Sequence, residues 1–297
     1  MAEESLALID ATGTLHLEGI AGAVPWWSFT KTVIAIAALR LVERGTLALD
    51  APLAGEEYSL AQLLRHEAGL SDYGGLARYH ADVAAGAAPW PVDRLLAETE
   101  ADRLRYAPGH GWAYSNIGYM KAATHIAQAA GLPLADALRQ LVFAPAGLAD
   151  TRLALEPADL ADVAMGGARG YHPGWVYHGL VVGPVVEAAR LLHALVTGGL
   201  LRPESFARLL DGRPLPEQRS ATYPDPAYGL GLMLWAHEPL GHPLGHTGGG
   251  PGSSIAVYAL GHRVCAVWSA ASVPVDPAAR AFARLAEALP AATKALE

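Results

Sequence analysis

The chain contains 297 residues, of which 52% are hydrophobic and 17% charged, so it can bury a sizeable core without disulfides or a structural metal. Its formal net charge is −8 and its 21 Lys and Arg residues are scattered, which argues against a nucleic-acid partner. The longest hydrophobic stretch, Val33–Val42, is interrupted by Arg40 and is too short to span a bilayer, so no membrane partner is expected.

The first residues, Met1–Ser5, are acidic, whereas a secretory signal would be basic and then apolar. We therefore expect a cytoplasmic protein. The single cysteine, Cys265, lies in the apolar run Val264–Trp268 and has no partner for an internal disulfide. We expect it in a buried strand.

Two short strands are predicted near the N-terminus, Leu6–Ile9 and Leu15–Leu17, on either side of a turn at 11–13. A helix is predicted over Ser28–Arg44, because its apolar residues recur at helical spacing. Gly45 is a suitable stop for this helix.

The long middle of the chain is predicted to be helical, with proline and glycine marking the loops. No further strand is predicted before about Tyr228. The helices expected in this region are Leu60–Arg65, Val92–Thr99, Ile117–Ala130, Leu134–Val142 and Val185–Thr197.

Strands are predicted again near the C-terminus, at Gly229–Trp235, Ser254–Leu260 and Val264–Ala270, with a hairpin turn at 260–262. The last element predicted is an amphipathic helix, Pro277–Leu289, with proline at the first helical position.

Strands at both ends with helices between them indicate an α+β fold, in which the two ends share one antiparallel sheet flanked by N- and C-terminal helices. We expect residues 1–57 together with 226–297 to form this sheet lobe. Residues 58–225 would form an inserted, mainly helical lobe, and the functional site would lie at the junction.

Ser28 and Lys31 form the first candidate pair. Positions three apart share one face of a helix, so the Lys31 amine can reach the Ser28 hydroxyl. A serine nucleophile needs a neighbour that accepts its proton, and a lysine can do so where burial lowers its pKa. The commoner meaning of such a pair is an N-cap serine followed by a solvent-exposed lysine, so the pair alone is weak evidence.

Tyr114 and Asn116 are the second candidate pair, in a loop just ahead of a predicted helix. Residues two apart in an extended segment point the same way. A phenol beside a lysine could shuttle a proton, and a carboxamide could hold a substrate amide. The alternative is that Ser115 or Asn116 caps the helix and Tyr114 only packs.

The third candidate is the glycine-rich segment Gly245–Gly252, expected as a loop between two strands. Glycines let a ligand approach the backbone closely, and a backbone N–H there could help form an oxyanion hole. The segment is not a P-loop, since it lacks the Lys-Ser/Thr ending and the following helix. A plain glycine-rich turn is the alternative.

In this order and spacing, the three elements resemble the S-x-x-K, Y-x-N and K-T-G or H-T-G signatures of the serine β-lactamase and penicillin-binding-protein superfamily. Here they are Ser28–Lys31, Tyr114–Asn116 and His246–Gly248. The likeness is greatest to the class C β-lactamase-like branch, which includes esterases, D-aminopeptidases and DD-peptidases. Other segments typical of that branch are 41–50, 63–70, 108–109, 145–151 and 228–231.

The resemblance implies a β-lactamase/transpeptidase-like fold and an acyl-enzyme mechanism that needs no cofactor and no metal. Ser28 would attack the substrate carbonyl, and Lys31 and Tyr114 would move its proton. His246 would line the site and support Tyr114, and the N–H groups of Ser28 and Gly249 would form the oxyanion hole. The implied substrate-binding residues are Asn116, His246, Thr247, Gly248 and Gly249.

Two departures from the family pattern bear on the substrate. Ala68 stands where the family usually has serine, and His246 is more typical of esterase and peptidase members than of dedicated β-lactamases. A β-lactamase would also usually be exported, which does not fit this N-terminus. We therefore expect a hydrolase of a small carboxylic ester, amide or peptide. A β-lactamase or a D-amino-acid peptidase or carboxypeptidase is the alternative.

Two other classes of protein remain as rivals. A catalytically inactive binding module of the same fold would be expected to have lost one of the four residues Ser28, Lys31, Tyr114 and His246. A metallohydrolase is suggested by His237, His242 and His246, but Pro243 and Gly245 disfavour the helix that would place two of these on one face.

Aromatic residues are expected to wall the pocket, which favours a bulky or apolar acyl group. The residues expected in this role are Trp26, Trp27, Tyr73, Trp112 and Trp175.

Overall fold

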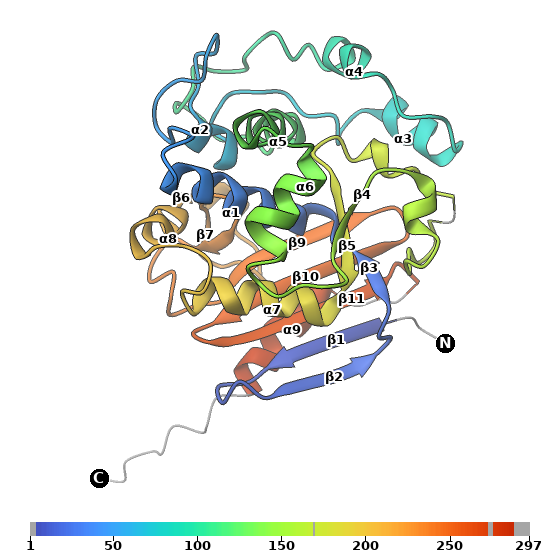
Figure 1. Cartoon of the computed structure of the whole chain (residues 1–297), viewed down its shortest axis with the longest axis vertical. Coiled ribbons are helices and arrows are strands. Elements are labelled where there is room, and N and C mark those ends of the chain that lie inside the picture. Colours follow the sequence, from blue (N-terminus) through green and yellow to red (C-terminus); the bar gives the residue numbers. More distant parts are fainter. Residues whose placement is uncertain (1–3, 169, 273–275, 288–297) are drawn as a thin grey trace.

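The computed structural model describes residues 4–168, 170–272 and 276–287. Its centre is an eight-stranded antiparallel sheet in the order β2-β1-β11-β10-β9-β8-β7-β6, so the two ends of the chain share one sheet (Figure 1). The strands of this sheet are β1 (Glu4–Ile9), β2 (Leu15–Gly19), β6 (Arg213–Pro214), β7 (Pro226–Tyr228), β8 (Met233–Trp235), β9 (Leu244–Gly250), β10 (Ser253–Leu260) and β11 (Arg263–Ala270).

Alternation along β1 sends its side chains into two separate cores, because successive residues of a strand face opposite sides of the sheet. Leu6 and Leu8 pack with α9 (Pro277–Glu287), whereas Ala7 and Ile9 join the larger core on the other face. The helix predicted over Pro277–Leu289 thus begins where expected, and its last two residues lie outside the described part of the chain.

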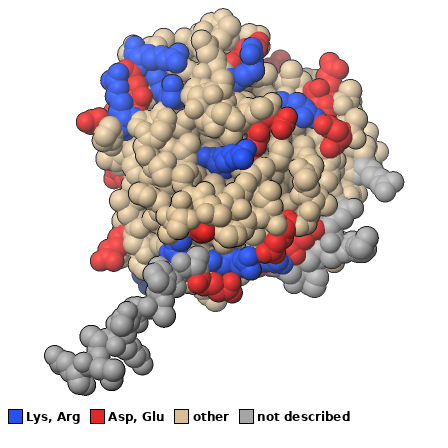
Figure 2. Space-filling view, turned by 60° about the horizontal axis from the view of Figure 1, so that its bottom comes forward, with Lys and Arg blue, Asp and Glu red and all other residues tan. Residues whose placement is uncertain are grey.

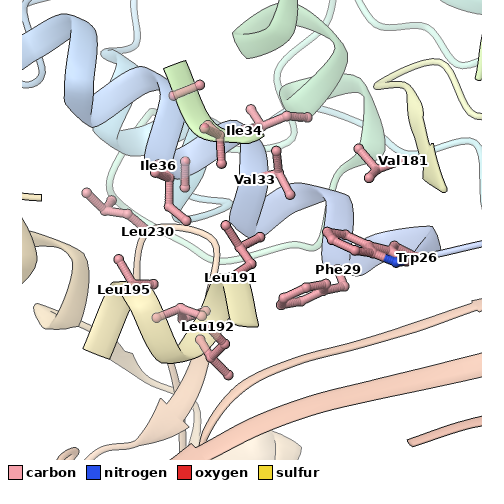
Figure 3. Close-up of a cluster of buried hydrophobic side chains, with 14 of the residues drawn as sticks. Trp26, Phe29, Val33, Ile34, Ile36, Val181, Leu191, Leu192, Leu195 and Leu230 are labelled. Carbon is pink, nitrogen blue, oxygen red and sulfur yellow. The ribbon is translucent and has the colours of Figure 1, made fainter. Parts of the chain in front are cut away.

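The larger core lies between the sheet and α1 (Thr30–Glu43). Residues 30–39 of this helix are all buried, including the polar residues Thr30, Lys31 and Thr32 of its first turn. Figure 3 shows Val33 and Ile36 of α1 in one cluster with Leu191 of α7 (Val185–Val196). Although α7 lies in the stretch expected to form the helical lobe, it packs on β1 and β11.

The predicted helices in the middle of the chain are present, and two more were not predicted, α3 and α8. The π-helical turn Arg139–Phe143 continues the helix expected over Leu134–Val142. These middle helices are α2 (Leu60–Leu64), α3 (Ala77–Ala84), α4 (Val92–Glu98), α5 (Asn116–Ala130), α6 (Leu134–Leu138) and α8 (Pro203–Leu210).

The expectation that no further strand occurs between the helix at 28–44 and about Tyr228 is wrong, since β4 (Arg152–Ala154), β5 (Leu180–Pro184) and β6 lie in this stretch. With β3 (Ala23–Pro25), β4 and β5 form a separate three-stranded antiparallel sheet. Strands of three to five residues carry too little alternation to be recognised in sequence.

The predicted strand Gly229–Trp235 is also wrong in its first half. Residues 229–232 form a turn between β7 and β8, because Gly231 has a φ of +72° and lies against α1. A Cβ on Gly231 would come within 2.8 Å of the carbonyl oxygen of Lys31, so this turn fits closely over the N-terminal part of that helix.

No helix among the described residues is long and apolar enough to cross a membrane. On the face shown in Figure 2, basic and acidic side chains lie next to one another rather than in patches of one sign. This face therefore has no basic surface of the kind that follows a phosphate backbone.

Candidate active site

Ser28 lies in a short 3-10 turn, Trp27–Phe29, that leads directly into α1. Trp27 has a φ of +44°, which is unusual for a large side chain. Strand β9 lies against this turn, and its glycines leave room for it. A Cβ on Gly248 would be 2.7 Å from the Ser28 nitrogen, and one on Gly250 would be 2.5 Å from the Trp27 ring.

This contact corrects the expectation for the segment Gly245–Gly252. Residues 244–250 are not a loop but strand β9, which pairs with β10 along its whole length. The glycines serve close packing rather than turning: a Cβ on Gly245 would be 1.9 Å from the carbonyl oxygen of Val257.

The Ser28 hydroxyl contacts both predicted proton-transfer groups. Lys31 Nζ lies 3.2 Å from Ser28 Oγ, one helical turn away, and the Tyr114 hydroxyl donates a hydrogen bond to Ser28 Oγ at 2.9 Å. Residues 86 positions apart in the sequence therefore meet at one oxygen atom.

Lys31 is fully buried, and burial lowers the pKa of its amine to about 7, against a weaker opposing effect of the Asp72 carboxylate. Its amine has three neighbours that can take part in hydrogen bonds: Ser28 Oγ, Asn116 Oδ1 at 2.6 Å and His178 Nε2 at 3.3 Å. An amine with this pKa is about half unprotonated at neutral pH, so it can accept a proton there.

Tyr114 is held by a network around the start of α5. Ser115 caps the helix by accepting from the Gly118 N–H, and its own N–H donates to His66 Nδ1 at 3.0 Å. The His66 ring lies 4.3 Å from the Tyr114 ring. Burial raises the pKa of the Tyr114 phenol, so this group is a neutral hydrogen-bond donor at ordinary pH.

His246 is buried on β9 and makes two hydrogen bonds, neither of which involves Tyr114. Its Nδ1 donates to the Thr247 carbonyl oxygen, so its Nε2 accepts from the Tyr228 hydroxyl at 2.8 Å. Burial and the nearby Lys31 lower its pKa to about 3. His246 is therefore neutral, and the direct support for Tyr114 that the resemblance implied is not seen among the described residues.

Two cavities open on either side of Ser28 and Gly249. Cavity 1, of about 310 Å³, is walled by Trp112, Tyr228, Met233 and the segment around Leu215–Tyr223. Cavity 2, of about 240 Å³, is walled by Trp27, Asn116, His178 and residues from 73 to 83. Thr247 lines cavity 1.

The aromatic residues expected around the pocket divide into two groups. Trp27, Tyr73 and Trp112 line the cavities, as expected. Trp26 and Trp175 are instead buried in the core, where their indole N–H groups donate to backbone carbonyls.

The three histidines considered as metal ligands do not converge. His242 stacks on Trp235, His237 contacts Asp225, and His246 bonds to Tyr228. In the described part of the chain, no three His, Cys, Asp or Glu side chains are grouped so that they could hold a metal ion.

Sequence reasoning gave no role to four residues that touch this network: His66, Asp72, His178 and Tyr228. Both His66 and Tyr228 lie inside segments that are typical of the family, which was a usable signal. Asp72 accepts from the Asn116 N–H at 2.7 Å, and His178 follows an irregular segment; neither carries a local pattern that marks it.

A match to a protein-family model shows which family the chain belongs to. The beta-lactamase family model matches residues 23–289, which is most of the chain. This chain belongs to the beta-lactamase family. The match runs from β3 through α1 and β9 to α9, and thus includes every residue of the site described above.

Two curated relatives match only part of the chain. The chain is 34% identical to the esterase EstB of Burkholderia gladioli over 143 residues, which is 41% of this chain and 36% of the esterase. It is also 34% identical to a penicillin-binding protein of Bacillus subtilis over 134 residues, 42% of this chain and 29% of that protein. These matches span about a third of the length of the curated relatives.

Solved structures extend the likeness to the whole fold. The D-amino acid amidase of Ochrobactrum anthropi SV3, in complex with L-phenylalanine amide, superposes with a TM-score of 0.79 at 21% identity, covering 96% of this chain and 92% of the amidase. A penicillin-binding protein of Bacillus halodurans gives 0.77 at 17% identity, covering 96% of both chains. The α+β fold with an antiparallel sheet and a mainly helical insertion is thereby confirmed as β-lactamase/transpeptidase-like.

Proposed function

We propose that this member of the family is a serine acyl hydrolase that forms an acyl-enzyme at Ser28 and acts on uncharged carboxylic esters or amides. The observation that supports this most directly is the position of Ser28 Oγ. It contacts Lys31 and Tyr114 at the same time and lies where two cavities meet.

Lys31 is the general base in this proposal, and Tyr114 the general acid. The neutral Lys31 amine accepts the Ser28 proton while Ser28 Oγ bonds to the substrate carbonyl carbon. As the bond to the leaving group breaks, Tyr114 donates a proton to the leaving atom and regains one from the Lys31 ammonium. Water then attacks the acyl carbon, its proton passes through Lys31 to Ser28 Oγ as the bond to Ser28 breaks, and the acid is released. The pKa of about 7 for Lys31 supports the role of base, and the raised pKa of Tyr114 supports that of acid.

The oxyanion that forms during attack would accept hydrogen bonds from the N–H groups of Ser28 and Gly249. Gly249 supports this assignment, since it lines both cavities beside Ser28 and has no heavy atom within 4 Å of its Cβ position. Asn116 and Thr247 would contact the substrate on opposite sides of the scissile bond.

The charge of the site favours an uncharged substrate. Among the described residues that line the two cavities there is no Lys, Arg, Asp or Glu, and His246 is neutral because its pKa is about 3. A substrate carboxylate would therefore lose its hydration without gaining a charged partner. An apolar acyl group fits cavity 1, and we expect longer or aromatic acyl esters to be turned over faster than acetates.

Two of the four relatives described above support an ester or amide as the substrate, since one is named an esterase and another an amidase. A β-lactamase or a carboxypeptidase is less well supported, because substrates of both kinds carry a carboxylate near the scissile bond.

The test is intact-mass spectrometry and turnover with four reagents, on wild type and Ser28→Ala: a fluorophosphonate, p-nitrophenyl butyrate, p-nitrophenyl hemisuccinate and nitrocefin. Wild type should gain the fluorophosphonate mass and hydrolyse the butyrate, and Ser28→Ala should do neither. The hemisuccinate differs from the butyrate mainly in its carboxylate, so it should be a poor substrate, as should nitrocefin.

Two results would count against the proposal. If wild type shows neither adduct nor turnover, the inactive binding module becomes the better account. If the hemisuccinate or nitrocefin is turned over as fast as the butyrate, the enzyme is a serine hydrolase but its substrate is not restricted to uncharged molecules.

A further inference from the structure

We propose that His178 is a positioning residue for the reaction: its neutral imidazole accepts a hydrogen from the Lys31 amine and so directs the amine lone pair at Ser28. This role rests on the proposed function, and it concerns a residue outside the three family motifs.

The position of His178 is fixed by its surroundings. It is only 2% exposed and lies just before β5, in a turn closed by a hydrogen bond from the Gly179 N–H to the Val176 carbonyl oxygen. The neighbouring Tyr177 is anchored at both ends, since its N–H donates to the Tyr73 hydroxyl and its own hydroxyl donates to the Trp90 carbonyl oxygen. The imidazole therefore cannot easily turn away from Lys31.

The hydrogen bonds around Lys31 can be assigned one by one. A neutral amine has two hydrogens and one lone pair. Asn116 Oδ1 can only accept, so it takes one hydrogen. Tyr114 donates to Ser28 Oγ, which leaves the hydrogen of Ser28 itself free to point at the lone pair. If His178 Nε2 takes the second amine hydrogen, both hydrogens are used and the lone pair is left to face Ser28.

Without His178, the second amine hydrogen has a competing acceptor in Ser28 Oγ, 3.2 Å away. The amine would then donate to the nucleophile instead of accepting from it, and the lone pair would point elsewhere. Misorientation of this kind slows proton transfer even though the base is present and unprotonated.

The protonation state of His178 fits this role. Burial, Lys31 and two other histidines, His246 and His66, lower its pKa well below the usual value, so the ring is neutral. A neutral ring that accepts at Nε2 carries its hydrogen on Nδ1. In the described part of the chain, Nδ1 is buried without a hydrogen-bond partner, so its hydrogen has no acceptor, and only the contact of Nε2 with the Lys31 amine selects this tautomer.

The other groups that face Lys31 do not replace His178 as an acceptor. Asp72 is the one carboxylate that acts on its pKa, and it bonds to the Asn116 N–H instead. The Tyr114 and Tyr119 rings lie 4.8 and 5.4 Å from Nζ. His66 and His246 are neutral, and each accepts a hydrogen bond from another group.

The test compares three variants with wild type over a range of pH, using p-nitrophenyl butyrate. His178→Gln keeps an acceptor at the reach of Nε2, whereas His178→Leu removes it and stays apolar. Leu180→Ala is the matched structural control, because it truncates a buried side chain of β5 that lines neither cavity.

We expect His178→Leu to lower kcat by about 30-fold or more with KM changed less than about threefold, and the loss to persist at pH 9, where Lys31 is unprotonated. His178→Gln should recover kcat to within about fivefold of wild type, and Leu180→Ala should lose thermal stability while keeping its kcat and pH profile.

The inference is overturned if His178→Leu keeps wild-type kcat, if its loss disappears at pH 9, or if His178→Gln is as slow as His178→Leu. The first result means that the acceptor is not needed, the second that His178 acts only on the charge of Lys31, and the third that the ring serves packing. Failure of the proposed function is seen separately, as the absence of a Ser28 adduct in wild type.

Discussion

Replacing Lys31 with methionine should abolish activity. It should also raise the free energy of unfolding, relative to wild type, more at pH 7 than at pH 9. The lysine is fully buried, and its pKa falls from 10.5 in the unfolded chain to about 7 in the fold. Between these two values the unfolded state binds a proton that the folded state does not. The stability of wild type therefore rises with pH across this window, whereas Lys31→Met has no such group.

The size of the effect follows from the two pKa values. At about 1.4 kcal/mol per pH unit, the buried lysine costs wild type about 4 kcal/mol at pH 7 and about 2 kcal/mol at pH 9. The hydrogen bonds that Lys31 makes to Asn116 and His178 are lost in the variant at every pH, so the absolute difference is less informative than its slope. The difference in unfolding free energy, variant minus wild type, should fall by about 2 kcal/mol from pH 7 to pH 9.

The assay is urea unfolding of both proteins at pH 7, 8 and 9, followed by circular dichroism. The other titrating groups are common to both proteins. The three histidines whose pKa Lys31 lowers are also buried, which keeps them neutral between pH 7 and 9, so they do not contribute to the slope. A difference that stays constant over this range would mean that Lys31 remains protonated in the fold. It would then refute the assignment of Lys31 as the base at neutral pH.

Three further predictions concern the phenol, the glycine strand and a buried carboxylate. Tyr114→Phe should lower kcat about 100-fold or more with little change in KM, since it removes the proposed acid; steady-state kinetics with an ester would show this, and a loss below about threefold would exclude the role. Gly248→Ala should lower the melting temperature more than Gly249→Ala. A Cβ at 248 would be 2.5 Å from the Trp26 carbonyl oxygen, whereas one at 249 meets nothing within 4 Å. Equal shifts of the melting temperature in calorimetry would contradict this. Glu187→Ala should destabilise the fold by about 3 kcal/mol, because the carboxylate accepts hydrogen bonds from two backbone N–H groups and from the Thr151 hydroxyl. Glu187→Gln should lose less unfolding free energy, as measured by denaturant unfolding. An equal loss in both variants would mean that Glu187 acts through packing instead.

Helices and strands could be predicted from the sequence where the local residue pattern and the packing of the folded chain favour the same element. The helix that carries Lys31, the terminal strands and the α+β class all follow from periodicity. Most of these elements are buried along their length, and the mostly exposed β2 is the exception. For the glycine-rich strand β9 the sequence predicts a loop, because glycine has low strand propensity and the contacts that require glycine there come from another part of the chain. The Cβ positions of Gly248 and Gly250 are occupied by the backbone of Trp26 and the ring of Trp27, more than 200 residues away in sequence.

The site shows the same limit. Four of the predicted site residues belong to short motifs that the sequence reveals, and hydrogen bonds link them in a chain: Tyr114 to Ser28, Ser28 to Lys31, and Lys31 to Asn116. His178 belongs to no motif. It reaches Lys31 because β3 and β5 pair, a contact between strands too short to be recognised. A residue whose role depends on a partner distant in sequence has no local sequence pattern that identifies it.

The two cavities are built from different parts of the chain, and this has a consequence for how the protein can change. The outer wall of cavity 1 comes from residues 215–223, and that of cavity 2 from residues 73–83. Ser28, the proposed nucleophile, lies between them and is fixed by β9, where Gly248 and Gly250 leave no room for an added Cβ. Selectivity for one side of the scissile bond can therefore drift without disturbing the other. A common catalytic centre could in this way serve hydrolases with many different pairs of acyl and leaving groups.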